Sequence, residues 1–194
     1  MELTEQFDNY EITNGMFRQM KAGQLQVAEK LGCTGTITVE AETKKVTKKC
    51  EGKTAKEKTI VEKLNCTFKG HMPVGILRKV YGLTDADLKK GVIGYSRNSV
   101  GASGALTFDV YDLGRENHKL VAFPNITFTD GLKFTIENGK EEIAEIEVAF
   151  SALFDANGYC YYEALAKEGE TDLETDIKTG WNSSFAPELV KKPQ

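Results

Sequence analysis

The chain has 194 residues, of which 40% are hydrophobic and 28% charged, and its formal net charge is −4. These proportions exclude a collagen-like or wholly disordered chain and favour a single globular domain. The acidic balance argues against a dedicated DNA-binding protein. No apolar run approaches the ~20 residues of a membrane-spanning helix, and the acidic N-terminus lacks the apolar segment of a signal peptide. We therefore expect neither membrane insertion nor export.

The N-terminal part of the chain predicts strands around a basic loop. Residues 16–31 fit either a hairpin turning at Lys21-Ala22-Gly23 or a helix that Gly23 would weaken, and we favour the hairpin. Residues 34–41 and 58–68 alternate apolar and polar side chains as strands do. Between them, the composition is typical of a long, mobile, lysine-rich loop over residues 44–58.

A short helix is predicted at Pro73–Tyr81. Proline suits the first position of a helix, Gly82 suits its end, and the apolar residues between them form one stripe that would lie on a sheet. Thr84-Asp85-Ala86-Asp87 then has the pattern of a capping box, which predicts a second, very short helix ending at Gly91. Residues 91–104, rich in glycine and serine, are predicted to form a loop.

The second half of the chain predicts five further strands. Residues 120–128 carry large apolar groups on both faces, which indicates a strand covered on both sides, although Pro124 requires an edge or a bulge. The alternating patterns cover residues 104–111, 120–128, 132–136, 143–152 and 159–162. Four dipeptides are typical of tight hairpin turns: Asn14-Gly15, Asp130-Gly131, Asn138-Gly139 and Asn157-Gly158.

These patterns divide the chain into three parts. Residues 1–32 form an N-terminal arm or β-segment, and residues 33–165 form a β-sandwich core that carries the basic loop. Residues 166–194 are acidic and thinly apolar, and we expect a C-terminal arm outside the core. The predicted fold is therefore mainly β: an antiparallel β-sandwich or open barrel with one short flanking α-helix.

No residue pattern for catalysis is found. His71 and His118 have no local partner motif, and Gly101-Ala102-Ser103-Gly104 is one residue short of a nucleophile elbow. We predict no enzyme, no cofactor and no bound metal. Without export and without zinc-site spacing, free thiols are expected at the four cysteines: Cys33, Cys50, Cys66 and Cys160.

Charge is distributed unevenly along the chain. Seven lysines against two glutamates give residues 43–58 a net charge of +5, and six acids against one lysine give residues 163–177 a net charge of −5. Five acids against one lysine make residues 137–147 net −4. Patches of opposite sign allow copies to associate head to tail, and such a contact builds a filament when it does not close. The alternatives are a solvated loop without a partner, or nucleic-acid binding, which the lack of arginine and aromatic residues disfavours.

The order of elements is strand, basic loop, strand, helix, a run of strands, and an arm. Its main features are Gly35–Glu40 leading into the loop, the return strand 63–70, the hairpin 123–150 ending in Val148–Ala152, and Trp181 near the end. This arrangement resembles the major tail proteins, or tail tube proteins, of long-tailed bacteriophages, over most of the chain. The resemblance implies a structural virion protein whose copies form hexameric rings stacked into a tube for genome delivery.

The resemblance also implies partners. These are further copies of the chain and other tail proteins (tape measure, tail terminator and distal tail proteins), with DNA passing through the lumen without specific binding. The protein would be made in the bacterial host cytoplasm and reside in the virion tail. The C-terminal arm would make an inter-subunit contact through Trp181 and Phe185, and acidic residues in the lumen would repel DNA phosphates. The inter-subunit loop would present Lys44, Lys45, Lys48, Lys49, Lys53 and Lys56, and the candidate lumen carboxylates are Asp109, Glu145 and Glu147.

A monomeric β-sandwich that binds carbohydrate or protein is the alternative function. Its binding surface would be the loops 91–104 and 113–119, in which Tyr95 is the only aromatic residue. This function predicts a monomer at every concentration. A nucleic-acid-binding domain using the basic loop would instead bind DNA with an affinity that falls steeply with salt.

Overall fold

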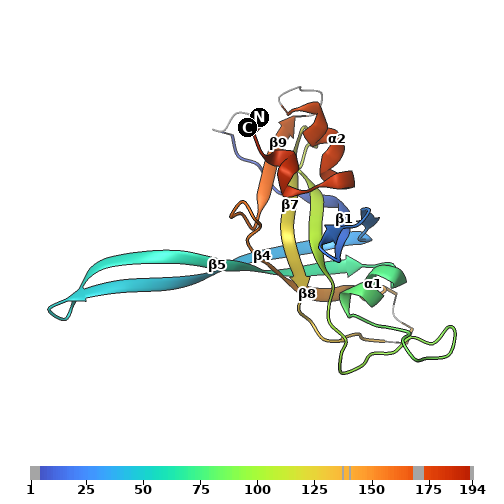
Figure 1. Cartoon of the computed structure of the whole chain (residues 1–194). Helices are drawn as coiled ribbons and strands as arrows, with labels where there is room; N and C mark the ends of the chain where they lie inside the picture. The colour runs from blue at the N-terminus through green and yellow to red at the C-terminus, as the bar shows by residue number, and fades with distance from the viewer. Residues whose placement is uncertain (1–4, 137, 140, 168–172, 193–194) are drawn as a thin grey trace.

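A computed structural model of the chain describes residues 5–136, 138–139, 141–167 and 173–192. They form an antiparallel sheet of nine strands in the order β2-β1-β6-β7-β8-β5-β4, with β3 beside β1 and β9 beside β7 (Figure 1). The predicted mainly-β class is confirmed. The strands are β1 (Glu11–Lys21), β2 (Gln24–Leu25), β3 (Glu29–Lys30), β4 (Cys33–Cys50), β5 (Lys53–His71), β6 (Ser103–Tyr111), β7 (Asn117–Phe128), β8 (Ile146–Ala152) and β9 (Tyr162–Lys167). The helices are α1 (Val74–Val80), α2 (Thr175–Ser184) and the 3-10 helix η1 (Pro187–Val190).

The N-terminal segment is part of the sheet. Residues Ala22 and Gly23 have φ angles of 48° and 77° between paired Lys21 and Gln24, so the predicted hairpin forms through a turn of the type I′ class. The prediction of a hairpin turn at Asn14-Gly15 is wrong. Asn14 has a φ of 53° inside β1, where the register with β6 shifts by one residue, so the dipeptide forms a β-bulge. Residues 11–30 therefore belong to the body rather than to an arm.

Strand β7 is covered on both faces, as its composition predicts. Val121 and Phe123 enter the larger core cluster, whereas Leu120 and Ala122 enter the smaller one. Pro124 sits where the ladder is interrupted: β9 pairs with β7 up to Ala122, β8 pairs with it from Ile126, and the register with β6 shifts between these points. A residue without an N–H group is tolerated there because no partner strand requires the donor.

The larger core lies between the two halves of the bent sheet and under α1. Phe17, Phe128, Phe123 and Phe150 stack edge to face, with ring centres 5.5–6.0 Å apart. The predicted helix at Pro73–Tyr81 is confirmed, since α1 begins after Pro73 and buries Ile76 and Val80. Its apolar stripe closes this core.

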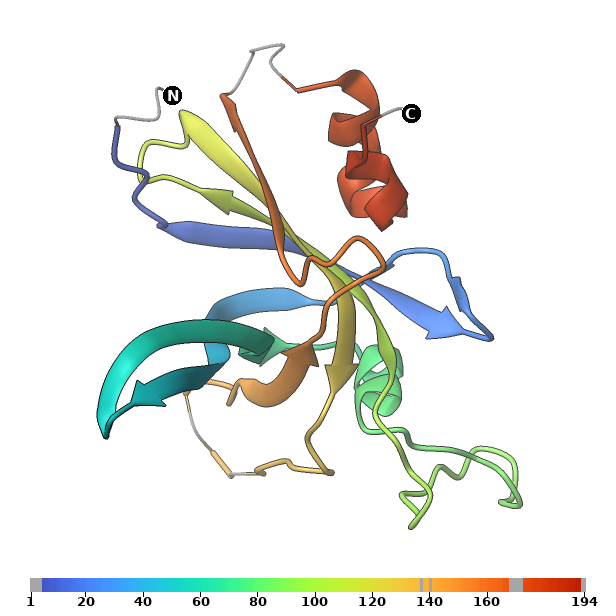
Figure 2. The ribbon, with the colours of Figure 1, turned by 60° about the vertical axis from the view of Figure 1, so that its left-hand side comes forward.

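The smaller core corrects the prediction of a C-terminal arm outside the body. Helix α2 lies over the face of β1, β6 and β7 that is remote from α1, as Figure 2 shows. Trp181 and Phe185 are completely buried there, and the small residues Ala105 and Ala122 make room for the indole ring. The low apolar content of residues 166–194 gave no indication that α2 packs on the sheet. Two large aromatic residues supply most of the surface that is buried there.

Three predicted elements are absent from the described residues. The strand predicted at residues 159–162 is not formed there, because only Tyr162 is in a strand, as the first residue of β9. Residues 132–136 alternate like a strand but pair with no other described strand, so neither Asp130-Gly131 nor Asn138-Gly139 turns a hairpin. Residues 84–91 form turns rather than a helix, because the Thr84 hydroxyl accepts from the Ala86 amide and Thr84 itself bridges to Gly94. The fourth dipeptide, Asn157-Gly158, does lie in a tight turn, in which the Gly158 amide donates to Asp155.

Candidate functional site: the projecting β4–β5 ribbon

The predicted basic loop at residues 44–58 is in fact a two-stranded β-ribbon. Strands β4 and β5 stay paired from Cys33 and His71 out to Cys50 and Lys53. Glu51 and Gly52, with φ angles of 48° and 77°, close the ribbon with a type I′ turn. The ribbon projects far from the body (Figure 1), and every residue from Thr38 to Glu62 is exposed. The lysines are thus held on a defined scaffold rather than on a loose segment.

The ribbon has two chemically different faces. Cross-strand partners share a face, and faces alternate along a strand. On one face of the ribbon, Lys44 lies opposite Ile60, Val46 opposite Lys58, and Lys48 opposite Lys56. Cys50 and its partner Lys53 continue this face next to the turn. The lysine face therefore consists of five lysines with Val46 and Ile60 between them: Lys44, Lys48, Lys53, Lys56 and Lys58.

The opposite face is less strongly charged. There Lys45 forms an ion pair with Glu57 at 2.8 Å, and Lys49 lies opposite Thr54 near the tip. Among the described residues, the five cations of the lysine face form no ion pair, and like charges opposite each other, as at Lys48 and Lys56, disfavour a strand pair. An acidic surface placed against this face would remove that repulsion.

The two edges of the ribbon also differ. Strand β4 pairs only with β5 in the described part of the chain, so its outer edge is open, and β5 pairs with β8 only from Leu64 to Gly70. Register shifts place the extra residues Ala55 and Glu62 on β5, whereas β4 runs without an inserted residue from Thr36 to Cys50. Bulges blunt an edge against pairing. The regular edge available to another strand is therefore that of β4.

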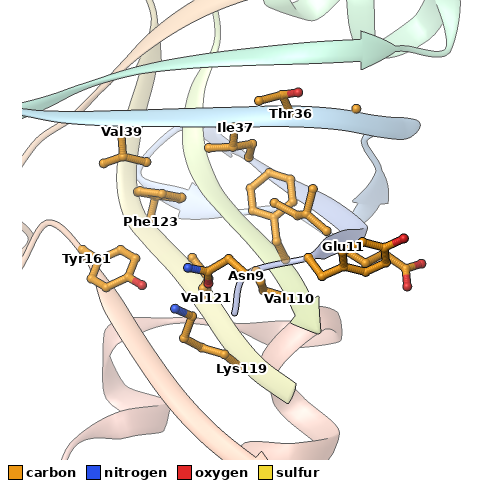
Figure 3. A pocket seen from close by; sticks show the side chains of 14 residues that line it. Asn9, Glu11, Thr36, Ile37, Val39, Val110, Lys119, Val121, Phe123 and Tyr161 are labelled. Carbon is orange, nitrogen blue, oxygen red and sulfur yellow. The ribbon is translucent and has the colours of Figure 1, made fainter. Parts of the chain in front are cut away.

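A groove runs along the base of β4, where the open barrel does not close. Its volume is about 440 Å³, and Ile37 and Val39 point across it from β4 toward Phe123 and Val121 (Figure 3). Lys119 lies at its rim, 3.8 Å from a carboxylate oxygen of Glu163.

A second hollow of about 470 Å³ adjoins the groove, with Val39 and Tyr161 common to both. Val61 and Leu64 of β5 line it together with Phe154 and Tyr159. Apolar side chains thus continue from the groove toward the ribbon. Sequence patterns did not reveal this strip, because its members lie on four separate segments.

The predicted lumen carboxylates are not grouped together. Asp109 is buried on β6, where its two carboxylate oxygens accept hydrogen bonds from the side-chain amides of Asn14 and Asn182, each at 2.9 Å. It fixes α2 to the sheet and is not available to line a channel, so this prediction is wrong. Glu147 lies 2.9 Å from Lys69, which lowers the pKa of the carboxyl group and raises that of the amine. Glu145 is exposed.

The predicted contact residues of the C-terminal arm are also placed differently. The indole N–H of Trp181 donates to the carbonyl of Val121 at 3.1 Å, and Arg18 donates to the carbonyl of Phe185 at 2.7 Å. Because both aromatic side chains pack inside their own chain, they offer no surface to a neighbour. The prediction of an inter-subunit contact through them is corrected.

The described residues show no arrangement for acid–base or nucleophilic chemistry. His71 is exposed at the end of β5, and His118 stacks on Tyr111 with ring centres 5.5 Å apart. No group of three or more metal-binding side chains occurs among the described residues. Burial raises the pKa of the Cys66 thiol to about 12, whereas Cys33 and Cys50 are exposed.

The chain matches no protein-family model, and no curated protein is similar to it. No helix in the described part of the chain is both long and apolar enough to cross a membrane. The loops of the alternative binding function expose Tyr95 and Leu113, but neither loop lines the two hollows described above apart from Lys119 at the rim.

Proposed function

We propose that this protein is a structural subunit that self-assembles into a hollow tube, as the tail tube proteins of long-tailed bacteriophages do. The ribbon β4–β5 is the observation that carries the proposal. It extends through Thr38–Glu62 without burying any residue in its own chain. An isolated two-stranded ribbon is at best marginally stable in water. A long ordered ribbon of this kind gains its packing from a partner.

Charge favours another copy of the chain as that partner. The ribbon is rich in lysine. A different part of the same chain, residues 141–145, carries three exposed carboxylates: Glu141, Glu142 and Glu145. A contact between two different patches of one chain is heterologous, so its repetition generates rings or filaments rather than a closed dimer. The groove and the open edge of β4 add the apolar surface and the hydrogen-bonding groups that such an interface needs.

Electron microscopy of concentrated protein tests the proposal directly. The wild-type chain should form hollow tubes of uniform diameter in negative stain, and their length should grow with concentration. Replacing Lys44, Lys45, Lys48 and Lys49 with glutamate should leave the far-ultraviolet circular dichroism unchanged, because all four side chains are exposed, and should abolish the tubes.

A matched control separates the ribbon from overall charge. The same change at Lys89, Lys90, Lys191 and Lys192, which are exposed and lie away from the ribbon, alters net charge equally and should leave tube formation intact. If the ribbon variant formed normal tubes, the lysines of the ribbon would not be required for assembly. A wild-type chain that sediments as a monomer or a closed dimer at every concentration would contradict the tube itself.

A further inference from the structure

The segment Gly131–Ile136, between β7 and β8, has the sequence of a strand but pairs with no strand in the described part of the chain. Among those residues, it is held to its own body only at Lys133, whose carbonyl accepts a hydrogen bond from the Tyr81 hydroxyl at 2.8 Å and whose amine lies 3.6 Å from a carboxylate oxygen of Glu147. Leu132, Phe134 and Ile136 alternate with polar residues, yet 66% of Phe134 and 81% of Ile136 remain exposed. Within the described part of the chain, its backbone joins no strand ladder. Exposed apolar side chains repeated at a period of two are typical of a strand whose apolar face is covered by something else.

The open edge of β4 offers what this segment lacks. Beside that edge, Ile37, Val39 and Ala41 point to the side of the two hollows and have the same two-residue spacing as Leu132, Phe134 and Ile136. Val39 and Val61 are each 42% exposed. An added strand would satisfy the free backbone groups of β4 and place alternate apolar side chains in the hollows, which is the usual mode of β-strand addition.

Charge fixes the direction of the added strand. Along β4, apolar residues come first and lysines follow from Lys44; along the donor segment, apolar residues come first and Glu141 and Glu142 follow. In a parallel register that sets Phe134 beside Val39, the donor segment runs in the direction of the β4 lysines, and Glu141 and Glu142 follow it on the lysine side. An antiparallel strand would carry the carboxylates away from the lysines.

The donor and the acceptor belong to different copies. The segment connects β7 to β8, and β5 separates β8 from β4 in the sheet. To reach the outer edge of β4 in its own chain it would have to cross β5 and β4. We therefore propose that residues 131–136 of one copy add as a parallel strand to the β4 edge of a second copy. This inference rests on the proposed self-assembly and names the segment that mediates it. Lysines along the β4 edge reject strands that lack the following acidic residues.

Photo-cross-linking in the full-length protein tests the contact. The variant Phe134→p-benzoylphenylalanine is mixed with an equal amount of 15N-labelled protein and irradiated, and mass spectrometry identifies cross-linked peptides from two copies. Inter-copy cross-links to residues 36–43 are expected. The matched control is Leu113→p-benzoylphenylalanine, since Leu113 is also 66% exposed but lies in the loop between β6 and β7. It should give no cross-link to β4.

A second pair of variants measures the energetic contribution. Phe134→Asp should weaken self-association in sedimentation velocity by at least about tenfold, whereas Leu113→Asp should change it less than twofold. Inter-copy cross-links elsewhere, or none, would overturn the inference. If tubes form but the cross-links lie elsewhere, the proposed contact is wrong and the proposed function stands. If the cross-links reach β4 but the oligomers are not tubes, the contact stands and the proposed tube-forming function is wrong.

Discussion

Substitution of Trp181 by alanine should destabilise the whole protein. The indole is buried to 99%, packs on Phe185 with ring centres 5.0 Å apart, and donates a hydrogen bond to Val121. Truncating a buried tryptophan typically costs about 3–5 kcal/mol of unfolding free energy. For a chain of this length that corresponds to a fall in Tm of roughly 10 °C. The milder change Trp181→Phe keeps an aromatic ring and removes the hydrogen bond, so about 1–2 kcal/mol is expected.

Urea unfolding followed by circular dichroism at 222 nm measures both effects. Circular dichroism is the appropriate signal because Trp181 is the only tryptophan, and its replacement removes the fluorescence probe. Val27→Ala is the control: Val27 is 82% exposed, and its truncation should change the free energy of unfolding by less than about 0.5 kcal/mol. A loss below about 1 kcal/mol for Trp181→Ala would show that α2 is not part of the cooperative unit, and would refute our description of the smaller core.

Two further predictions concern thiols and glycines. At pH 8, iodoacetamide should modify Cys33 and Cys50 within minutes, while Cys66 should react only as the protein unfolds, because burial keeps its thiol protonated; fast labelling of Cys66 in mass spectrometry would contradict that burial. Its raised pKa adds stability that is fully present below about pH 9, the ordinary value of a thiol, and is lost as the pH rises toward about 12. Gly104→Ala should cost more than about 2 kcal/mol in urea unfolding, because a Cβ atom there would lie 2.0 Å from the Arg18 carbonyl oxygen. Gly75→Ala, in the open surface of α1, should instead stabilise by about 0.5 kcal/mol, and equal effects at both positions would refute the close approach at Gly104.

Alternation predicted most of the sheet because most strands bury one face or both. Strand β7 was the clearest case, since large apolar residues on both faces match its two cores. Helix α1 was predicted from Pro73 and one apolar stripe. By contrast, residues 132–136 alternate in the same way but pair with no strand among the residues that the structure describes. Alternation of apolar and polar residues predicts a strand with one buried face. It does not indicate whether that face is buried by the same chain or by another.

The candidate site was predicted in composition but not in form. Lysine enrichment between two strands suggested a loop, because the segment also contains Gly52 and no large aromatic residue. The signal that was missed is Glu51-Gly52, which forms a two-residue turn at the centre of the segment. The β-branched residues Val46 and Ile60 lie on the two strands that this turn joins. The groove and the buried position of Asp109 depend on contacts between distant segments, which no local pattern contains.

One edge of β7 serves two partners in succession, and Pro124 lies where they change. The amide of Leu153 donates to the carbonyl of Asn125, just beyond the last residue pair of the ladder with β8, and Pro124 precedes Asn125 in the chain. The chain leaves the sheet, turns through Asn157 and Gly158, and returns as β9 on the remaining part of the same edge. Residues 123–125 thus form the unpaired interval that separates the two ladders on this edge, and the one residue in the strand without an N–H group lies at its centre.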